Sequence, residues 1–302
     1  YNRPAAVKRA VIGEREVLRM AQFTNQAQLS YNNAVKNSNI AVGEILEVLS
    51  ATKTAVENAY GQNDTVTYVI NIVNSGTLAF TGLNISDNLG AYMESTLTLT
   101  PLEYVPGTLQ YYVGGVRQTA PAVTAGPPLV ISGITVPAGG NATLIYEART
   151  NQYAPPTRES SISNQAVLRG GGITPITVTE TVGAQSAPEL CITKSVSPVP
   201  VAENGILTYT FLIQNGGNTA AEAGDNVVVT DIFNPVLSEV SVALNGTAWT
   251  EGADYTYNET TGEFITTAGR ITVPAAAFTQ ESTTGAWVSN PGVSVLTVTG
   301  RV

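Results

Sequence analysis

Histidine is absent from this chain of 302 residues, cysteine occurs once, at Cys191, and methionine occurs only twice. Catalytic triads built on histidine are therefore excluded, and zinc sites, iron–sulfur clusters and disulfide frameworks have no set of ligands to use. We accordingly expect no metal ion and no cofactor. Charged residues make up only 12% of the chain, about half the share in ordinary soluble domains. Apolar residues reach 43%, so the chain can bury large cores beneath a sparsely charged surface.

Positive charge is scarce and unevenly placed. The net charge is −9, yet residues 1–19 hold five basic and two acidic side chains, so a basic arm over residues 1–21 precedes an acidic body. Phosphate binding needs a positively charged patch, and because the body has none we expect no nucleic-acid partner. No uncharged apolar run approaches the roughly 18 residues that a membrane-spanning helix needs, so no membrane span is predicted.

Beyond the arm, the chain consists of short runs rich in valine, isoleucine, threonine and tyrosine that alternate with period two. Thr65–Asn74, Thr143–Thr150 and Leu207–Asn215 are examples, and glycine, proline and asparagine separate the runs. This pattern is typical of an all-β sandwich, and the length predicts two domains. Gly114-Gly115 and Asn245-Gly246 each lie between strand-like flanks, which predicts two tight hairpin turns.

The body of the chain contains an internal duplication. Phe23–Leu29 (FTNQAQL) is similar to Ile162–Leu168 (ISNQAVL), and Ser50–Thr54 (SATKT) is similar to Cys191–Ser195 (CITKS). Further landmarks follow in the same order in both copies, namely Thr67-Tyr68 and Thr208-Tyr209, Asn74–Gly76 and Asn215–Gly217, Ile85–Asp87 and Val229–Asp231, and Ile134–Pro137 and Ile271–Pro274. Two related folding units are therefore expected.

These landmarks carry a resemblance to a known family over roughly residues 22–302. A Lys-Ser/Thr strand, a Thr-Tyr strand ending in Asn-x-Gly, a Ser/Thr-Asp strand and an Asn-Gln-Ala strand resemble the bacterial surface repeat catalogued as domain of unknown function number eleven. The resemblance implies Greek-key, immunoglobulin-like β-sandwiches in tandem, found in stalks, adhesin spacers and envelope structures and often crosslinked by Lys–Asn isopeptide bonds. We therefore predict an all-β fold with sandwiches at residues 49–186 and 187–302, preceded by a strand pair at 22–48.

The repeats are out of phase with the ends of this chain. Lys53 precedes Asn164 by 111 residues, so the asparagine that matches Lys194 would fall near position 305, beyond Val302. The second sandwich is therefore expected to lack its final strands, whereas residues 22–48 form a closing pair with no sandwich before them. A sandwich without its final strands exposes apolar surface and an unpaired backbone edge, which favours the addition of strands from elsewhere.

We predict that the strand pair of one chain completes the second sandwich of the next, which would give an open head-to-tail polymer. The donor strand would present Phe23, Ala27, Leu29 and Tyr31. Asn25 precedes Lys53 by 28 residues, much as Asn164 precedes Lys194 by 30, which places the strand pair in a domain before the first sandwich. Two alternatives stay open: the pair closes the gap in its own chain, or the sequence is a piece of a longer repeat array.

Period-two alternation places polar residues among the inward-facing apolar ones. In the first unit these residues are Lys53, Asp87 and Asn164, and in the second they are Lys194 and Asp231, with Asn25 of a neighbouring chain as the third member. Burial favours a neutral amine beside a protonated acid, and a neutral amine can attack a carboxamide. The expected reaction is the isopeptide bond that the resemblance implies, within the chain at Lys53 and Asn164, and between chains at Lys194 and Asn25. The alternative is a hydrogen-bonded cluster that only specifies the fold.

The function expected from these features is structural. We predict a subunit of a bacterial surface or spore appendage, extracellular, whose partner is itself. The alternative is a monomeric adhesin or ligand-binding module of a longer array. No pairing of a nucleophile with a base predicts an enzyme that acts on an external substrate. Cys191 is expected to be an inert side chain, with an intermolecular disulfide as the alternative. The sequence does not identify an adhesion target.

Overall fold

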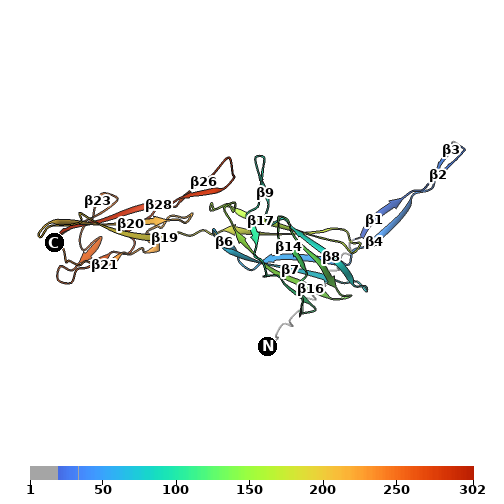
Figure 1. Ribbon diagram of the computed structural model, residues 1–302, viewed down its shortest axis with the longest axis horizontal. Coiled ribbons are helices and arrows are strands. Elements are labelled where there is room, and N and C mark those ends of the chain that lie inside the picture. The colour runs from blue at the N-terminus through green and yellow to red at the C-terminus, as the bar shows by residue number, and fades with distance from the viewer. Residues whose placement is uncertain (1–19, 33) are drawn as a thin grey trace, which may run out of the picture.

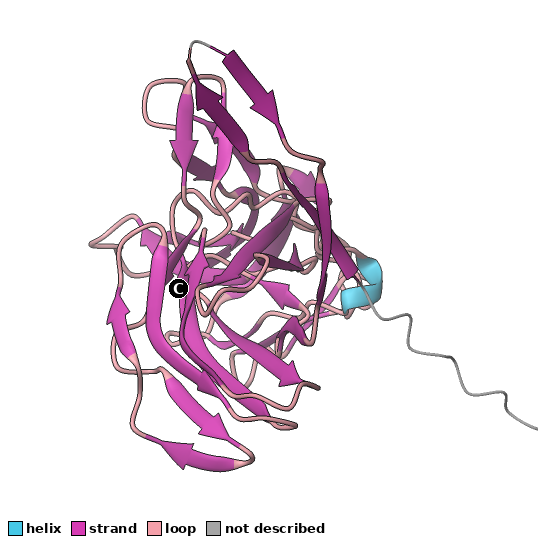
Figure 2. Cartoon of the chain, turned by 90° about the vertical axis from the view of Figure 1, so that its right-hand side faces the viewer, coloured by secondary structure: helices cyan, strands magenta, loops and turns pink. Residues whose placement is uncertain are grey.

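The computed structural model describes residues 20–32 and 34–302, and the side chains of 24–32, 34–43 and 47–302. Most of the predicted basic arm, 1–21, therefore lies outside the described residues. Within them the chain is strand and loop, with one short 3-10 turn, η1 (Ala223–Asp225) (Figures 1 and 2). The predicted all-β class with two tandem sandwiches is confirmed.

The first sandwich consists of two sheets that face each other across one core. One sheet comprises β5 (Leu49–Ala55), β7 (Thr65–Asn74), β16 (Asn141–Thr150), β12 (Gln110–Val113), β13 (Val116–Gln118) and β11 (Leu102–Tyr104). The other comprises β14 (Ala122–Thr124), β15 (Leu129–Val136), β8 (Phe80–Asp87), β17 (Ser161–Arg169), β18 (Ile176–Ala184) and β6 (Ala59–Tyr60). Burial alternates along β7, β16 and β17, as the period-two pattern predicts.

The two predicted hairpin turns are confirmed. Val113 pairs with Val116 and Leu244 pairs with Thr247, so two residues form each turn. Gly114, Gly115, Asn245 and Gly246 all have positive φ angles, which this kind of tight turn requires.

The second sandwich has one complete sheet and one short sheet. The complete sheet comprises β19 (Leu190–Ser197), β20 (Ile206–Asn215), β28 (Gly292–Arg301), β22 (Ser238–Leu244) and β23 (Thr247–Ala248). Opposite it, β21 (Thr230–Ile232), β25 (Glu263–Thr266) and β24 (Tyr255–Tyr257) form a sheet of three strands. β21, β25 and β24 correspond to β8, β15 and β14 of the first sandwich. Within residues 190–302, no strand occupies the positions of β17 and β18.

The N-terminal hairpin, residues 20–46, extends away from the first sandwich (Figure 1). It comprises β1 (Met20–Asn25), β2 (Gln28–Tyr31), β3 (Ala34–Asn37) and β4 (Ala41–Leu46), with β1 paired to β4 and β2 paired to β3. The second sandwich lies at the opposite end of the elongated molecule (Figure 1). In the isolated chain the hairpin therefore does not fill the gap in its own second sandwich.

Two hairpins meet where the sandwiches adjoin. β26 (Ala277–Gln280) and β27 (Trp287–Asn290) extend from the second sandwich toward β9 (Tyr92–Glu94) and β10 (Leu97–Leu99) of the first (Figure 1). The Trp287 amide donates to the Gln152 carbonyl at 2.9 Å, and Gln280 Nε2 donates to the Tyr92 hydroxyl at 3.4 Å. The two sandwiches are thus held together by contacts besides the linker.

One buried asparagine has the same role in each sandwich. The Asn74 side chain donates to the Leu78 carbonyl and accepts from the Gly76 amide, each at 2.8 to 2.9 Å. The Asn215 side chain donates to the Thr219 carbonyl and accepts from the Gly217 amide at the same distances. The loops after β7 and β20 are therefore equivalent, with Leu78 at the position of Thr219.

Candidate functional site

A buried ion pair connects the two sheets of the first sandwich. Lys53 extends from the edge strand β5 of one sheet, and Asp87 ends β8 of the other. Lys53 Nζ lies 2.6 Å from Asp87 Oδ2, and both side chains have 0% exposure. A buried pair is costly unless its remaining hydrogen-bonding groups are satisfied, so its surroundings decide what it does.

Two tyrosines complete the surroundings of this pair. The Tyr146 hydroxyl donates to Asp87 Oδ2, and the Leu89 amide donates to Oδ1. The Tyr68 ring lies 4.6 Å from Lys53 Nζ in a cation–π contact and stacks on Tyr146 with ring centroids 5.7 Å apart. The carboxylate therefore has donors on both oxygens, while an aromatic face covers the amine.

Asn164 lies in the same buried cluster, on β17. It is fully buried beside Tyr68 and Tyr146, where burial raises the pKa of both hydroxyls and Asn164 opposes that rise without cancelling it. Its Oδ1 accepts from the Gly90 amide at 3.2 Å, whereas its Nδ2 makes no hydrogen bond of ordinary geometry. An unpaired buried amide nitrogen is rare and is an indication of function.

Burial sets the protonation of the cluster. It lowers the pKa of Lys53, and the neighbouring Asp87 carboxylate opposes that shift without cancelling it. Burial also raises the pKa of Tyr146 and of Tyr68 above the ordinary value. Lys53 can therefore lose its proton more readily than a lysine in water, while both phenols stay neutral.

This arrangement contains the parts of an amide-exchange reaction. Lys53 supplies a nucleophilic amine once its proton has moved to Asp87, and Asn164 supplies a carbonyl carbon. The Gly90 amide donates to Asn164 Oδ1, the oxygen that would carry negative charge in a tetrahedral intermediate. The unpaired Nδ2 is the group that would leave as ammonia. The three residues singled out from the sequence are thus brought into one cluster, and whether they form a bond stays a prediction.

The second sandwich repeats the pair with greater exposure. Lys194 of β19 and Asp231 of β21 form an ion pair whose side chains are 39% and 18% exposed. Lys194 Nζ lies over the rings of Tyr209 and Phe233, at 4.4 and 5.2 Å from their centroids. Tyr209 corresponds to Tyr68, because each is the tyrosine of the repeated Thr-Tyr landmark. Each also pairs with the next strand of its sheet, Tyr68 with β16 and Tyr209 with β28.

Two members of the first cluster have no counterpart in the second. Tyr146 pairs with Tyr68 across the first sheet, and at the same place Val298 pairs with Tyr209, so Asp231 has no phenol donor from that strand. The position of Asn164 on β17 has no equivalent strand within residues 190–302. The second site therefore holds the amine and the acid but not the carboxamide.

The missing strands leave an open face on β19, defined by Leu190, Ile192, Lys194 and Val196. The first sandwich covers the equivalent strand, where Leu49 is 9% and Lys53 4% exposed, whereas Leu190 is 39% and Ile192 51% exposed. The adjacent edge strand β21 is unpaired on its outer side within the described chain, and its Ile232 is also exposed. An open apolar face beside an unpaired edge is suited to accept strands.

The N-terminal hairpin is exposed in a complementary way. Leu29, Tyr31 and Val42 are each more than half exposed, and Asn25 and Ala27 are also exposed. The side chain of Phe23 lies outside the described residues, although its backbone belongs to β1. Asn25 and the site of Lys194 and Asp231 therefore lie at opposite ends of one chain and are not brought together within it.

Sequence reasoning missed the roles of Tyr68, Tyr146 and Gly90. The period-two pattern contained a signal for both tyrosines, because each lies in an inward-facing row with a polar atom at its tip. Gly90 has a φ of +72°, and a Cβ there would lie 2.5 Å from the Ile162 side chain, so this backbone requires glycine. Nothing in the sequence alone indicates that its amide points at Asn164.

Other kinds of site find no support within the described part of the chain. No helix there is both long and apolar enough to cross a membrane. Residues 20–32 and 34–302 contain no group of three potential metal-ligating side chains. Cys191 is exposed, with Sγ 3.9 Å from the Gln214 side-chain oxygen.

Comparison with protein-family models and with curated proteins gave no match. Among solved structures, the chain is similar to the pilus backbone RrgB from Streptococcus pneumoniae, with 13% identity, 80% of this chain and 55% of that chain covered, and a TM-score of 0.33. It thus spans a little over half the length of that protein. It is also similar to BcpA, the major pilin subunit of Bacillus cereus, with 12% identity, coverages of 89% and 73%, and a TM-score of 0.34. A third similar structure, a collagen-binding domain from a Staphylococcus aureus adhesin, has 11% identity, coverages of 45% and 97%, and a TM-score of 0.30. Scores and identities in this range assign no function.

Removal of the acid should affect the two sandwiches unequally. Asp87→Ala leaves Lys53 buried without its partner, which should cost the first sandwich about 3–5 kcal/mol. Asp231→Ala affects a pair that solvent already screens, so it should cost the second sandwich only about 0–1 kcal/mol in the unassembled chain. Denaturant unfolding of the monomer measures the free energy of unfolding of both variants. Equal losses would contradict the difference in burial between the two Lys–Asp pairs.

The raised tyrosine pKa values predict alkaline destabilisation. The unfolded chain loses phenolic protons near pH 10 while the folded chain retains them. The free energy of unfolding is therefore unaffected by these two tyrosines below that pH and declines as the pH rises above it. Tyr146→Phe should therefore reduce this decline by about 1.4 kcal/mol per pH unit, although it lowers stability at neutral pH. Unfolding measured from pH 8 to 11 tests this, and an unchanged alkaline slope would contradict it.

Proposed function

We propose that this protein is the structural subunit of a bacterial surface or spore appendage, which polymerises when the N-terminal hairpin of one chain enters the open face of the next. The observation that carries the proposal is that two complementary surfaces, the open face on β19 and the N-terminal hairpin, are both exposed in the isolated chain. The open face lacks a strand pair with an asparagine, and the N-terminal hairpin is an exposed strand pair with an asparagine. The resemblance to bacterial surface repeats is in keeping with this role.

The first sandwich supplies the expected register. There β17 runs antiparallel to β8, with Ala166 opposite Asp87 and Leu168 opposite Ile85. Because Ala27 corresponds to Ala166 and Asp231 to Asp87, the donor strand should run antiparallel to β21 with Ala27 opposite Asp231. Leu29 would then lie opposite Val229, and Asn25 would take the place of Asn164.

The hydrophobic gain is large enough for a durable complex. Entry of the hairpin would cover apolar groups on both sides, namely Leu29 and Tyr31 on the hairpin and Leu190, Ile192, Val196 and Ile232 on the second sandwich. Each buried side chain of this size contributes roughly 1.5–3 kcal/mol, so burial of five or six would contribute roughly 8–18 kcal/mol against the ~4–15 kcal/mol cost of association. Main-chain hydrogen bonds along β21 would add register and direction.

A covalent bond would then lock the joint. Lys194 Nζ would attack Cγ of Asn25 from the neighbouring chain after transfer of its proton to Asp231. The new N–C bond would form as the bond from Cγ to Nδ2 breaks, and one ammonia would leave. Within each chain, Lys53 and Asn164 would react in the same way, so each bond lowers the mass by one ammonia.

Complementary variants test both the partner and the bond. Asn25→Ala removes the donated carboxamide and leaves Lys194 able to react, whereas Lys194→Ala removes the amine and leaves Asn25. Each variant alone should run as a monomer on a denaturing gel after boiling, while the unsubstituted chain gives a ladder. A mixture of the two variants should give a covalent dimer and nothing larger, because only one joint can form.

Three outcomes would contradict the proposal. A ladder from either variant alone would show that the assigned residues do not form the bond. An unsubstituted chain that loses two ammonias but stays monomeric would mean that the hairpin closes its own chain. Absence of a dimer from the mixture would mean that the open face is covered in another way, for example by a segment after Val302, as a monomeric adhesin or repeat-array module would require.

A further inference from the structure

Among the described residues, the two most exposed large apolar side chains are Leu78, at 77%, and Val199, at 76%. Leu78 follows β7 in a loop beside the start of β5, where the Ser75 amide donates to the Val48 carbonyl. Val199 follows β19 in a loop beside the C-terminal strand, where the Val302 amide donates to the Gly205 carbonyl. They therefore lie at opposite ends of the paired sandwiches.

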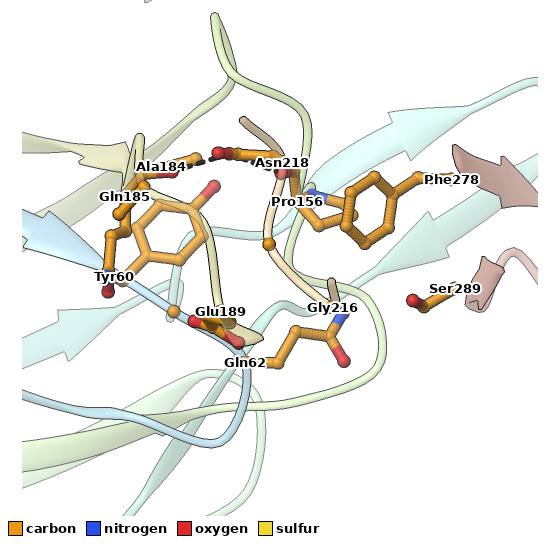
Figure 3. Close-up of a pocket in the computed structure, with 13 residues that line it drawn as sticks. Tyr60, Gln62, Pro156, Ala184, Gln185, Glu189, Gly216, Asn218, Phe278 and Ser289 are labelled. Carbon is orange, nitrogen blue, oxygen red and sulfur yellow. Dashed lines mark hydrogen bonds between the residues drawn. The ribbon is translucent and has the colours of Figure 1, made fainter. Parts of the chain in front are cut away.

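The junction between the two sandwiches of one chain shows how the end of one sandwich contacts the end of another. The loop at 60–62 of the first sandwich and the loop at 216–218 of the second line one cavity of about 210 Å³ (Figure 3). Asn218 crosses this junction and donates to the carbonyls of Pro156, at 2.9 Å, and Gln185. Thr219 Oγ1 lies 3.2 Å from Ser186 Oγ. Side chains of the loop at 216–219 thus contact the first sandwich through hydrogen bonds.

The duplication maps this junction onto the two ends of the chain. Lys53 and Lys194, Asn74 and Asn215 each lie 141 positions apart. The loop at 216–219 therefore corresponds to 75–78, with Leu78 at the position of Thr219. On the other side, Val199 corresponds to Asn58. At both outer ends, an exposed apolar side chain stands where the other sandwich has a polar residue.

We propose that the Leu78 end of one chain docks on the Val199 end of the chain that accepts its hairpin. This inference rests on the proposed function and adds a second, apolar contact at the same joint. The linker favours a close approach, because Asn25 precedes Lys53 by two residues fewer than Asn164 precedes Lys194. A small cavity of about 80 Å³, lined by Val48, Leu49, Phe80 and Ile173 among others, adjoins the same end of the first sandwich.

The covalent dimer from the complementary variants offers an internal control. The Lys194→Ala chain donates the bonded hairpin, so its Leu78 lies at the covalent joint and its Val199 at the end where no bond can form. The Asn25→Ala chain accepts that hairpin, so its Val199 lies at the covalent joint and its Leu78 at the end where no bond can form. The same substitution can therefore be placed at the joint or away from it in one assembly.

The experiment measures cleavage of the joint by Glu-C protease. The donor chain is labelled with nitrogen-15, so that cleavage after its Glu47, in the linker between β4 and β5, is distinguished by mass. Leu78→Asp in the donor should accelerate this cleavage about tenfold, the factor that loss of one buried leucine contact represents. Leu78→Asp in the acceptor should leave it unchanged. Val199→Asp should act in the acceptor and not in the donor.

The outcomes separate the two proposals. Equal cleavage with Leu78→Asp in the donor and in the acceptor would overturn the docking contact while the dimer itself upholds the polymer. Absence of the dimer before any substitution at Leu78 or Val199 would overturn the proposed function and this contact with it. Because Leu78 and Val199 are both exposed in the isolated chain, the substitutions should not prevent folding.

Discussion

An incomplete second layer is the constraint on which the rest of this structure depends. A sandwich buries its core only if both sheets cover each other, and a sheet edge in solvent presents unpaired donors and acceptors. In the second sandwich, β19 has no strands over it, and the outer edge of β21 is unpaired within residues 190–302. In the proposed assembly, the free energy gained by covering that face drives the hairpin of one chain to bind the next.

The two Lys–Asp pairs show how one chain can hold a finished site and an unfinished one. In the first sandwich the amine, acid and carboxamide lie in one buried cluster with two tyrosines. In the second, the amine and acid are partly exposed, and within residues 190–302 no strand occupies the position from which Asn164 reaches the first cluster. Crosslinking between chains would therefore wait for assembly, because burial and the third group arrive together with the hairpin.

The sequence was sufficient to predict the all-β class and the tandem sandwiches, because period-two alternation and glycine-containing turns are local signals. It also placed Lys53, Asp87 and Asn164 on inward faces, since alternation fixes which side chains share a face. It could not give the contact between the Gly90 amide and Asn164, which depends on how the loop after β8 turns. Nor could it show the exposure of Leu78, because that depends on which loop ends the sandwich and on what packs there.

The central claim is that Lys194 of one chain bonds to Asn25 of another, and isotope labelling tests it most directly. Chains labelled with nitrogen-15 and unlabelled chains are mixed while unfolded, allowed to assemble and digested, and the peptide pair that joins Lys194 to Asn25 is weighed. Donation between chains predicts linked pairs with one light and one heavy peptide, alongside the uniform pairs that random mixing gives. Linked pairs that are always uniformly light or uniformly heavy, or no linked pair at all, would contradict the account.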